Sequence, residues 1–244
     1  MTWALDLDGV VWLADTPIPG AAEAVDRLRR RGERVVFLTN NSSPTVDHYV
    51  DKLGRMGIPT AATDVVTSAQ AAARLLEPGT TALLCAGPGV EEALAERGVR
   101  VVRHGNADAV VVGWHRDFDF DRLAAATAAI HGGARLIGTN EDATYPTPEG
   151  ELPGGGALLA AVATAGGVVP VVAGKPHEPM AALVAERVGA VDVMVGDRPS
   201  TDGLFARRLG ARFALVLSGV TSADDLPVVP EPDEVASGVA DLVA

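Results

Sequence analysis

A single cysteine, Cys85, is present among the 244 residues, so the chain cannot form an intramolecular disulfide. No window approaches the roughly 18 consecutive apolar residues that a membrane-spanning helix requires. The N-terminus lacks the basic flank and the long apolar core of a signal peptide. These absences exclude a disulfide-stabilised secreted scaffold and a transmembrane protein, and we therefore expect a cytoplasmic protein with no membrane partner.

Basic side chains are also scarce. The 20 lysines and arginines are outnumbered by 32 acidic residues, which gives a formal net charge of −12. This charge disfavours nucleic acids and anionic membrane surfaces as partners. Only two of the 20 basic residues are lysines, Lys52 and Lys175, so each lysine in this chain requires a specific explanation.

Hydrophobic residues make up 48% of the chain, which is enough for one sizeable core or two modest ones. The pattern predicts a strand from Trp3 to Leu7, a helix from Ala21 to Leu28 and a buried strand from Val35 to Leu38. This alternation continues and predicts an α/β fold with a largely parallel sheet. Further strands are expected at residues 65–66, 82–85, 109–112, 136–137, 168–173, 193–195 and 214–217.

Two helix starts carry capping signals. Ser43 followed by Pro44 is typical of an N-cap and a first helical residue. Thr201 or Asp202 is suited to cap the helix that runs to Leu209. Both positions predict a helix that begins close to the end of a strand.

The strongest local signal is Asp6-Leu7-Asp8-Gly9, at the end of the first predicted strand. Ligands bind beyond the carboxyl ends of strands in open parallel sheets, and strand alternation places Asp6 and Asp8 on one side of the chain. One carboxylate could attack as a nucleophile while the other transfers protons. The alternative is a helix cap or a turn, because Asp-Gly is common in turns.

Two further clusters follow predicted strands. Thr39, Asn40 and Asn41 offer a hydroxyl, side-chain amides and backbone N–H groups to an anion, or they form a polar loop. Lys175 is a compact cation suited to a phosphate oxygen, the alternative being a solvated lysine. It is not a P-loop lysine, because Pro176 follows it and the glycine spacing is wrong.

A fourth cluster contains two acidic residues. Asp197 follows the strand expected at 193–195 and could join Asp6 and Asp8 in an oxygen-ligand site suited to Mg²⁺. We expect Asp202, in the same loop, to have a structural role in ordering the loop or a metal-bound water. The four clusters therefore all lie at strand ends.

These clusters and their order resemble the haloacid dehalogenase-like superfamily. More narrowly, the chain resembles the NagD-like and p-nitrophenylphosphatase-like (class IIA) phosphatases in the stretches DLDGVVW, FLTNNS, GTNED, GKP and GDRPSTD. The resemblance extends from about Leu5 to Thr221. Few unrelated sequences would match this set of motifs in this order.

The resemblance implies a Mg²⁺-dependent phosphatase that hydrolyses a small phosphate monoester through an aspartyl-phosphate. Asp6 would be the nucleophile and Asp8 the general acid and base. Thr39 and Lys175 would hold the phosphoryl group, with Asn40 beside them. Three groups would bind Mg²⁺: an Asp6 carboxylate oxygen, the Asp8 main-chain carbonyl and Asp197.

The resemblance also implies a Rossmann-like, doubly wound core with a large inserted α/β cap. Residues 1–77 and 169–244 would form the core and residues 78–168 the cap, which would cover the site and select the leaving group. Asn140 and Asp142 are candidate substrate contacts, the alternative being a role in the cap fold or in a subunit contact. Caps in this branch often mediate dimers, so a homodimer through the cap is a further expectation.

Two other functions stay open at this point. One is a phosphotransferase or phosphomutase of the same fold, and the other is a catalytically silent protein that binds a phosphorylated metabolite. Phosphoglycolate, glycerol phosphate, nucleotides and sugar phosphates all stay open as substrates. Trp12, near the acidic loop, either lines the substrate entrance or packs beneath the cap.

Overall fold

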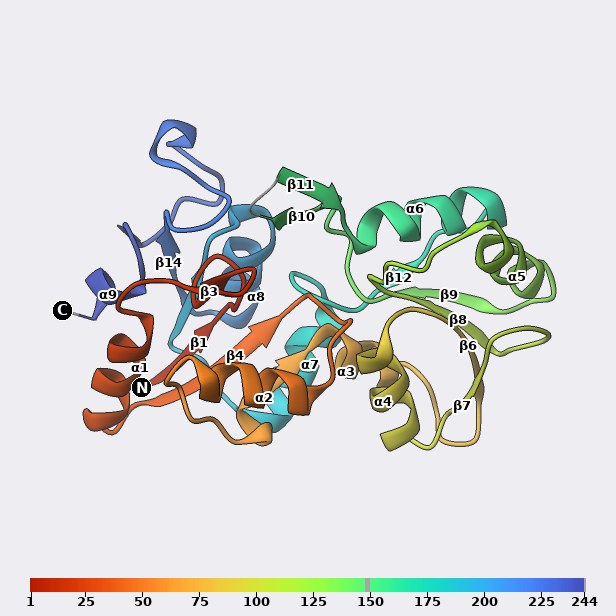
Figure 1. The fold of residues 1–244 in the computed structure, drawn as a ribbon, viewed down its shortest axis with the longest axis horizontal. Helices are drawn as coiled ribbons and strands as arrows, with labels where there is room; N and C mark the ends of the chain where they lie inside the picture. The colour runs from red at the N-terminus through yellow and green to blue at the C-terminus, as the bar shows by residue number, and fades with distance from the viewer. Residues whose placement is uncertain (148–149, 244) are drawn as a thin grey trace.

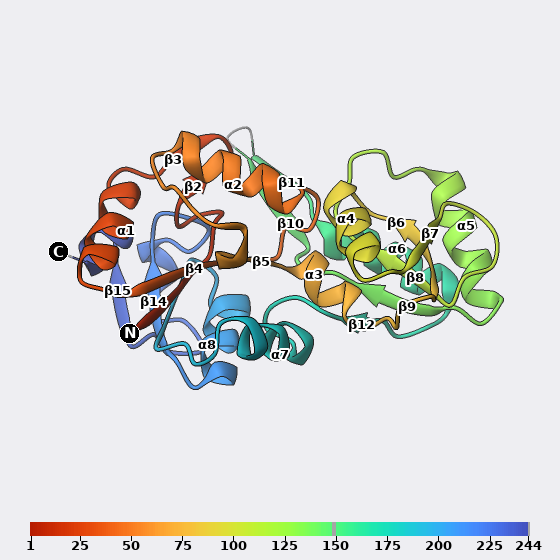
Figure 2. The ribbon, with the colours of Figure 1, turned by 90° about the horizontal axis from the view of Figure 1, so that it is seen from below.

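The computed structural model describes residues 1–147 and 150–243, which form two α/β units joined side by side (Figures 1 and 2). A six-stranded parallel sheet organises the first unit and a five-stranded parallel sheet the second. The α/β class expected from the sequence is therefore confirmed. Among the described residues, none of the helices has the length and apolar character needed to cross a bilayer.

The first sheet has the strand order β15-β14-β13-β1-β4-β5. The chain adds strands on one side of β1 and later on the other, so β1 lies at a topological switch point, where ligands bind in such folds. Leu5 pairs with both Phe37 and Val195, so the central strands end at one edge. The strands are β1 (Thr2–Leu5), β4 (Arg34–Thr39), β5 (Val65–Thr67), β13 (Val193–Gly196), β14 (Arg212–Val216) and β15 (Glu234–Ala236).

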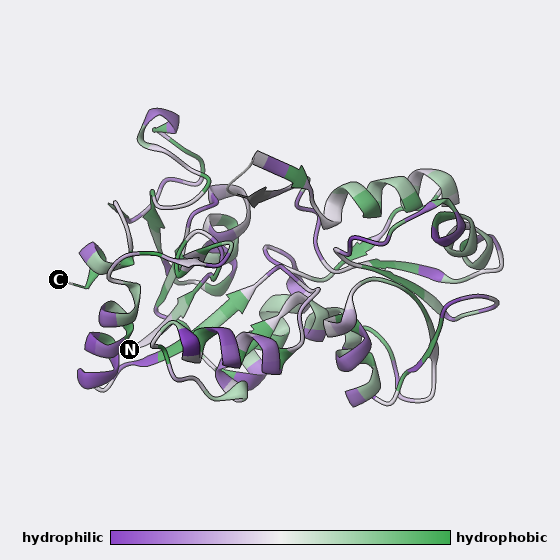
Figure 3. Cartoon of the chain, viewed as in Figure 1, coloured by the Kyte–Doolittle hydropathy of each residue, from purple (hydrophilic) through white to green (hydrophobic). Residues whose placement is uncertain are grey.

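Helices cover both faces of the first sheet, because its strands are apolar on both sides. Leu5 and Phe37 belong to a cluster with α1, α2 and α9, whereas Ala4 and Val36 belong to a cluster with α3, α7 and α8. Figure 3 shows the hydrophobic strands and the hydrophilic outer sides of α1 and α2. The helices are α1 (Ala21–Arg30), α2 (Val46–Arg55), α3 (Ser68–Ala73), α7 (Glu178–Arg187), α8 (Leu204–Leu209) and α9 (Val239–Leu242).

The second sheet has the strand order β12-β9-β8-β6-β7. Its strands are β6 (Thr81–Cys85), β7 (Arg100–Val102), β8 (Ala109–Val112), β9 (Arg135–Gly138) and β12 (Val171–Val172). Its helices are α4 (Pro88–Glu96), α5 (Phe120–His131) and α6 (Gly155–Gly166). Two antiparallel hairpins complete the fold: β2 (Trp12–Leu13) with β3 (Thr16–Pro17), and β10 (Thr144–Thr147) with β11 (Gly150–Pro153).

The two units share one apolar cluster. It includes Leu38 of β4 and Ala72 of α3 in the first unit, and Leu94 of α4 and Val111 of β8 in the second. Helices α3 and α4 are in contact where the chain passes between the units. The second sheet also contains β12, whose two residues lie beyond residue 168, where we expected the cap to end.

The helix start expected at Ser43 is wrong. Helix α2 begins at Val46, and its N-cap is Thr45, whose hydroxyl accepts the His48 N–H at 3.2 Å. The Ser43 N–H instead donates to the Asn41 side chain at 3.2 Å, which forms a turn ahead of the helix. The asparagine side chain therefore delays the helix by two residues.

The strand expected at residues 168–173 is also too long. Only Val171 and Val172 pair with β9, and Val169 is 92% exposed. Pro170 has no N–H to donate to a sheet, and β12 is an edge strand, where such residues are found. The valine-rich run thus continues into the sheet for two residues only.

Cys85 is fully buried at the end of β6 in the second unit. Burial raises the pKa of its thiol from 9.0 to about 12. Because the thiolate is the reactive form, dithionitrobenzoate should label the folded protein about a thousandfold more slowly than protein unfolded in guanidinium. Fast stoichiometric labelling of the folded chain would contradict this burial.

Candidate active site

Polar residues lie at the carboxyl ends of the three central strands of the first sheet. Asp6 directly follows β1, Thr39 ends β4 and Asp197 directly follows β13. They line a cavity of about 60 Å³ at the junction of the two units, together with residues of the second unit. All but one of the sequence-predicted site residues line this cavity, and the exception, Asp202, contacts Lys175 from behind.

Lys175 is the buried cation of the site, with 1% of its side chain exposed. Its amine lies 2.6 Å from Asp202 Oδ1 and 2.9 Å from Asp6 Oδ1, and it donates to the Leu38 carbonyl at 3.3 Å. Burial alone would lower the pKa of Lys175, but the carboxylates of Asp202 and Asp6 raise it above its ordinary value. The amine is therefore charged and has an acceptor for each of its three N–H bonds.

Asp202 holds this amine and its own loop together. Its Oδ1 accepts from Lys175, and its Oδ2 accepts the Arg198 N–H at 3.1 Å. The expected N-cap at Thr201 or Asp202 is wrong, because α8 begins at Leu204, after a short π-helical turn over Pro199–Gly203. The carboxylate folds back on this turn and onto Lys175 and does not cap the helix.

The neighbouring carboxylates of Asp6, Asp197 and Asp202 exceed the charge that one lysine can balance. Burial raises the pKa of Asp6 well above its ordinary value, Lys175 opposes this shift, and Asp202 and Asp197 add to it. Burial and the neighbouring Asp202 also raise the pKa of Asp197 to about 7. A further cation beside these two carboxylates would favour the ionised form of both near neutral pH.

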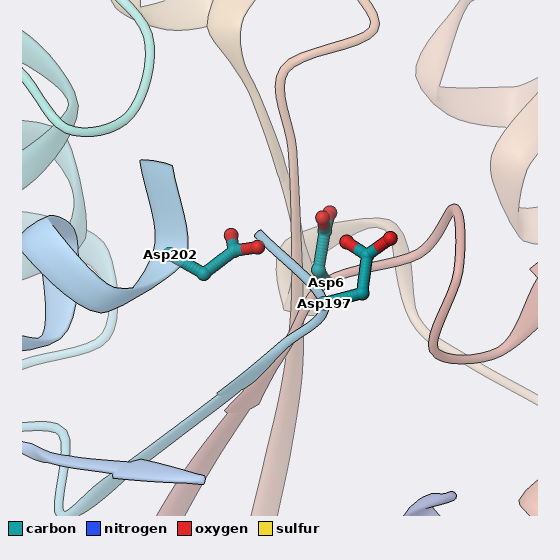
Figure 4. A group of neighbouring side chains, drawn as sticks. All are labelled: Asp6, Asp197 and Asp202. Carbon is teal, nitrogen blue, oxygen red and sulfur yellow. The ribbon is translucent and has the colours of Figure 1, made fainter. Parts of the chain in front are cut away.

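The donor set fits a hard divalent cation. Carboxylate oxygens of Asp6, Asp197 and Asp202 lie within 4.8 Å of one another, and Figure 4 shows Asp6 and Asp197 side by side with Asp202 turned towards them. Oxygen ligands of this kind suit Mg²⁺. Gly9 has φ +84°, and a Cβ there would collide with the Asp197 carboxylate, so the main chain after Asp8 approaches Asp197 closely.

Asp8 has two hydrogen-bond donors on one oxygen. Its Oδ1 accepts from Trp12 Nε1 at 3.1 Å and from the Tyr145 hydroxyl at 3.2 Å. Trp12 is buried beneath this loop and stacks on Tyr49, and the Lys52 amine lies 4.3 Å from the centroid of the Trp12 ring. Burial raises the pKa of Asp8, although Lys52 and the two donors oppose the shift.

The Thr39 loop is tied to the Lys175 loop through one amide. Asn40 Oδ1 accepts the Lys175 N–H at 2.8 Å, and Asn40 Nδ2 donates to the Lys175 carbonyl at 3.0 Å. Thr39 Oγ1 accepts the Asn41 N–H at 3.0 Å. These bonds fix the hydroxyl and the amine on neighbouring parts of the cavity wall.

The loop after β9 connects the second unit to this wall. Asn140 Nδ2 donates to the Asn40 carbonyl at 2.7 Å, and the Asp142 carboxylate accepts from Asn40 Nδ2 at 3.1 Å. Burial raises the pKa of Asp142, with Arg198 and the Asn40 hydrogen bond opposing the shift. The second unit therefore closes directly over the residues of the first.

Comparison with known proteins was consistent across three independent lines. The family model described as haloacid dehalogenase-like hydrolase matches residues 3–100, and a second, HAD-hydrolase-like model matches residues 172–242. The D-glycerol 3-phosphate phosphatase of Mycobacterium tuberculosis is 39% identical over 93% of this chain, which spans 65% of that relative's length. An acid sugar phosphatase of Staphylococcus aureus is 33% identical, with 92% of this chain and 89% of the relative covered.

Solved structures agree with these relatives. The p-nitrophenyl phosphatase from Archaeoglobus fulgidus superposes with a TM-score of 0.92 at 29% identity, covering 99% of this chain and 97% of the other. The glycerol phosphate phosphatase from Mycobacterium tuberculosis, solved in complex with magnesium, gives a TM-score of 0.89 at 35% identity, with coverages of 100% and 78%.

A doubly wound α/β sheet with an acidic cluster at its strand ends and a second α/β unit above it is the arrangement of a capped phosphoric monoester hydrolase. The chain belongs to the haloacid dehalogenase-like hydrolases and, within them, to the NagD-like and p-nitrophenylphosphatase-like phosphatases. The family expected from the sequence is thus confirmed.

The sequence did not predict two contacts of Asp8 or the contact of Lys52 with Trp12. Trp12 packs beneath the loop and donates to Asp8, Lys52 lies over the Trp12 ring, and Tyr145 reaches Asp8 from the second unit. The sequence held one signal that Lys52 has a specific role, because the chain has only two lysines. Lys175 lines the cavity, whereas Lys52 lies against the Trp12 ring and does not line it.

The buried position of Lys175 predicts that Lys175→Arg will lose activity. A planar guanidinium does not fit between Asp6, Asp202 and the Leu38 carbonyl without displacing them. We expect kcat/KM for an aryl phosphate to fall by at least about a hundredfold, with circular dichroism unchanged. Lys52→Arg is the matched control, because an arginine can also stack on Trp12. Wild-type kinetics for Lys175→Arg would show that the site does not need the compact amine of Lys175.

Proposed function

We propose that the chain hydrolyses small phosphate monoesters through an aspartyl-phosphate on Asp6, with Asp8 as general acid and base. The observation that carries this proposal is the placement of the buried Lys175 amine 2.9 Å from the Asp6 carboxylate, in a cavity that also contains Thr39 and Asp8. A nucleophile, an acid and a phosphate-binding cation are then next to one another.

In the first step, an Asp6 carboxylate oxygen attacks phosphorus as the bond from phosphorus to the leaving-group oxygen breaks. The Asp8 carboxyl gives its proton to that oxygen, so the alcohol leaves neutral and Asp8 becomes a carboxylate. The raised pKa of Asp8, caused by its burial, supports the protonated form that this step needs. Lys175 and Thr39 hold the phosphoryl oxygens.

In the second step, the Asp8 carboxylate takes a proton from a water molecule whose oxygen attacks the phosphorus of the aspartyl-phosphate. The bond from phosphorus to the Asp6 oxygen breaks, phosphate is released, and Asp6 returns to its carboxylate form. Asp8 is protonated again, so both residues regain their starting states. The same group thus acts as acid and then as base.

Mg²⁺ is the cofactor that this site suits, with Asp6, the Asp8 main-chain carbonyl and Asp197 as its ligands. When bound, it supplies positive charge that offsets the repulsion between the carboxylate nucleophile and the anionic substrate. Asp202 keeps both of its oxygens engaged with Lys175 and Arg198, which supports a positioning role. The burial that raises the pKa of Asp6 makes this added charge necessary for a competent nucleophile.

We propose that residues 78–168, with β12, act as the cap that selects the leaving group. The cap side of the cavity contains Asn140, Asp142 and Thr144, which suit a small hydroxylated leaving group. Relatives named for D-glycerol 3-phosphate and for acid sugars support polyol and sugar phosphates as the substrate class. A homodimer through this cap stays a prediction.

The nucleophile is tested by Asp6→Asn. The amide keeps an oxygen to accept from Lys175 and the Leu7 N–H, but it is a poor nucleophile, so hydrolysis of p-nitrophenyl phosphate should fall by about a thousandfold or more. Asp26→Asn, on the exposed side of α1, is the matched control and should behave as wild type. Retained turnover in Asp6→Asn would remove Asp6 from this role.

The cofactor is tested by exhaustive chelation. Turnover should stop and return when Mg²⁺ is added, and Mg²⁺ should also raise the thermal unfolding temperature because it binds only the folded chain. Asp197→Asn should abolish that rise in unfolding temperature while the protein still folds. Turnover that persists after metal removal, or a rise that survives Asp197→Asn, would contradict the assignment.

A further inference from the structure

The cap makes a direct hydrogen bond to the proposed general acid. Tyr145 belongs to β10, in the hairpin that crosses from the second unit, and its hydroxyl lies 3.2 Å from Asp8 Oδ1. The phenol ring packs against Trp114, with ring centroids 5.1 Å apart, and Trp114 Nε1 donates to the Pro153 carbonyl of β11 at 2.9 Å. The hydroxyl is therefore held in place by the cap itself.

The two donors to Asp8 come from different units. Trp12 follows Asp8 by four residues and is buried in the first unit, so it contacts Asp8 wherever the cap lies. Tyr145 is 137 residues away in the chain and contacts Asp8 only while the hairpin rests on the first unit. Closure of the cap therefore adds the second donor.

These donors determine which oxygen of Asp8 carries the acidic proton. A carboxyl oxygen has two lone pairs, and the N–H of Trp12 and the O–H of Tyr145 occupy both on Oδ1. Both donors bind Oδ1, and among the side chains that the structure describes none donates a hydrogen bond to Oδ2 of Asp8. A protonated Asp8 thus carries its hydrogen on Oδ2, which is free to meet the leaving-group oxygen.

We propose that Tyr145 is a positioning residue that makes Asp8 an effective acid only when the cap is closed. The proposal rests on the function proposed above. With both donors in place, Oδ1 is fixed and Oδ2 holds the proton; without Tyr145, the carboxyl group can rotate and exchange the two oxygens. The chemistry is then coupled to cap closure through one phenol.

The coupling has a kinetic signature that a purely structural role lacks. In the first step, the bond from phosphorus to the leaving oxygen breaks and Asp8 donates its proton to that oxygen. Phenolate is basic and needs this proton, whereas 4-nitrophenolate is stable as an anion and needs it much less. Each ester is compared between wild type and variant, so a difference in how the two esters fit the wild-type site cancels from the comparison.

The experiment measures kcat/KM for phenyl phosphate and 4-nitrophenyl phosphate with the Mg²⁺-loaded full chain. This constant reports the steps through leaving-group departure. Tyr145→Phe keeps the ring and its contact with Trp114 and removes only the hydroxyl. We expect the value for phenyl phosphate to fall by about tenfold and that for 4-nitrophenyl phosphate to change by less than about threefold.

Tyr49→Phe is the matched control, because Tyr49 is the other tyrosine of the chain and its buried hydroxyl donates to the Asn41 carbonyl and not to Asp8. This variant should keep the wild-type ratio of the two constants. Equal losses on both substrates in Tyr145→Phe, or no loss on either, would overturn the positioning role. If the wild-type chain hydrolysed neither of the two esters, that result would instead overturn the proposed function.

Discussion

The Lys175 amine is a fully buried charge, and several groups of the site accept its hydrogen bonds. An unpaired ammonium in the interior costs several kcal/mol, so three acceptors from three separate elements converge on it: Asp6 after β1, the Leu38 carbonyl within β4, and Asp202 in the turn before α8. Asp202 also packs against Gly196 so closely that a Cβ there would collide with it. One amine therefore links β4, the loop after β1 and the segment before α8.

The main chain of Lys175 is fixed as firmly as its side chain. Asn40 receives its N–H and donates to its carbonyl, and the same amide reaches Asp142 of the cap. A Cβ on Gly174 would collide with Asn40 and with the Thr139 carbonyl, so this crossing has no spare room. The loop that carries Lys175 and the loop that carries the cap contacts are thus one hydrogen-bonded system.

The sequence predicted the parts of this system that local pattern controls. Apolar runs located the central strands, and Asp6, Thr39 and Asp197 followed from the rule that polar residues end strands at a binding edge. Three boundaries failed for local reasons, since Asn41 builds a turn ahead of α2, Pro170 shortens β12, and Asp202 binds Lys175 and does not cap α8. The contact of Tyr145 with Asp8 has no periodic signal, because it joins residues of two different units that are far apart in the sequence. The way the two units pack together determines this contact, and the sequence pattern does not reveal it.

The distribution of the two lysines has a consequence for covalent regulation. Lys175 has 1% of its side chain exposed and Lys52 has 12%, so arginines supply almost all of the basic side chains on the exterior of the described chain. Acetyl and other acyl donors react with amines and leave guanidinium groups untouched. Lysine acylation thus has no target on the outer surface, and any acyl group that did attach to a side chain would sit in the active site or against Trp12. Acylation of a lysine would therefore alter either the Lys175 ion pairs or the packing of Trp12 beside Asp8.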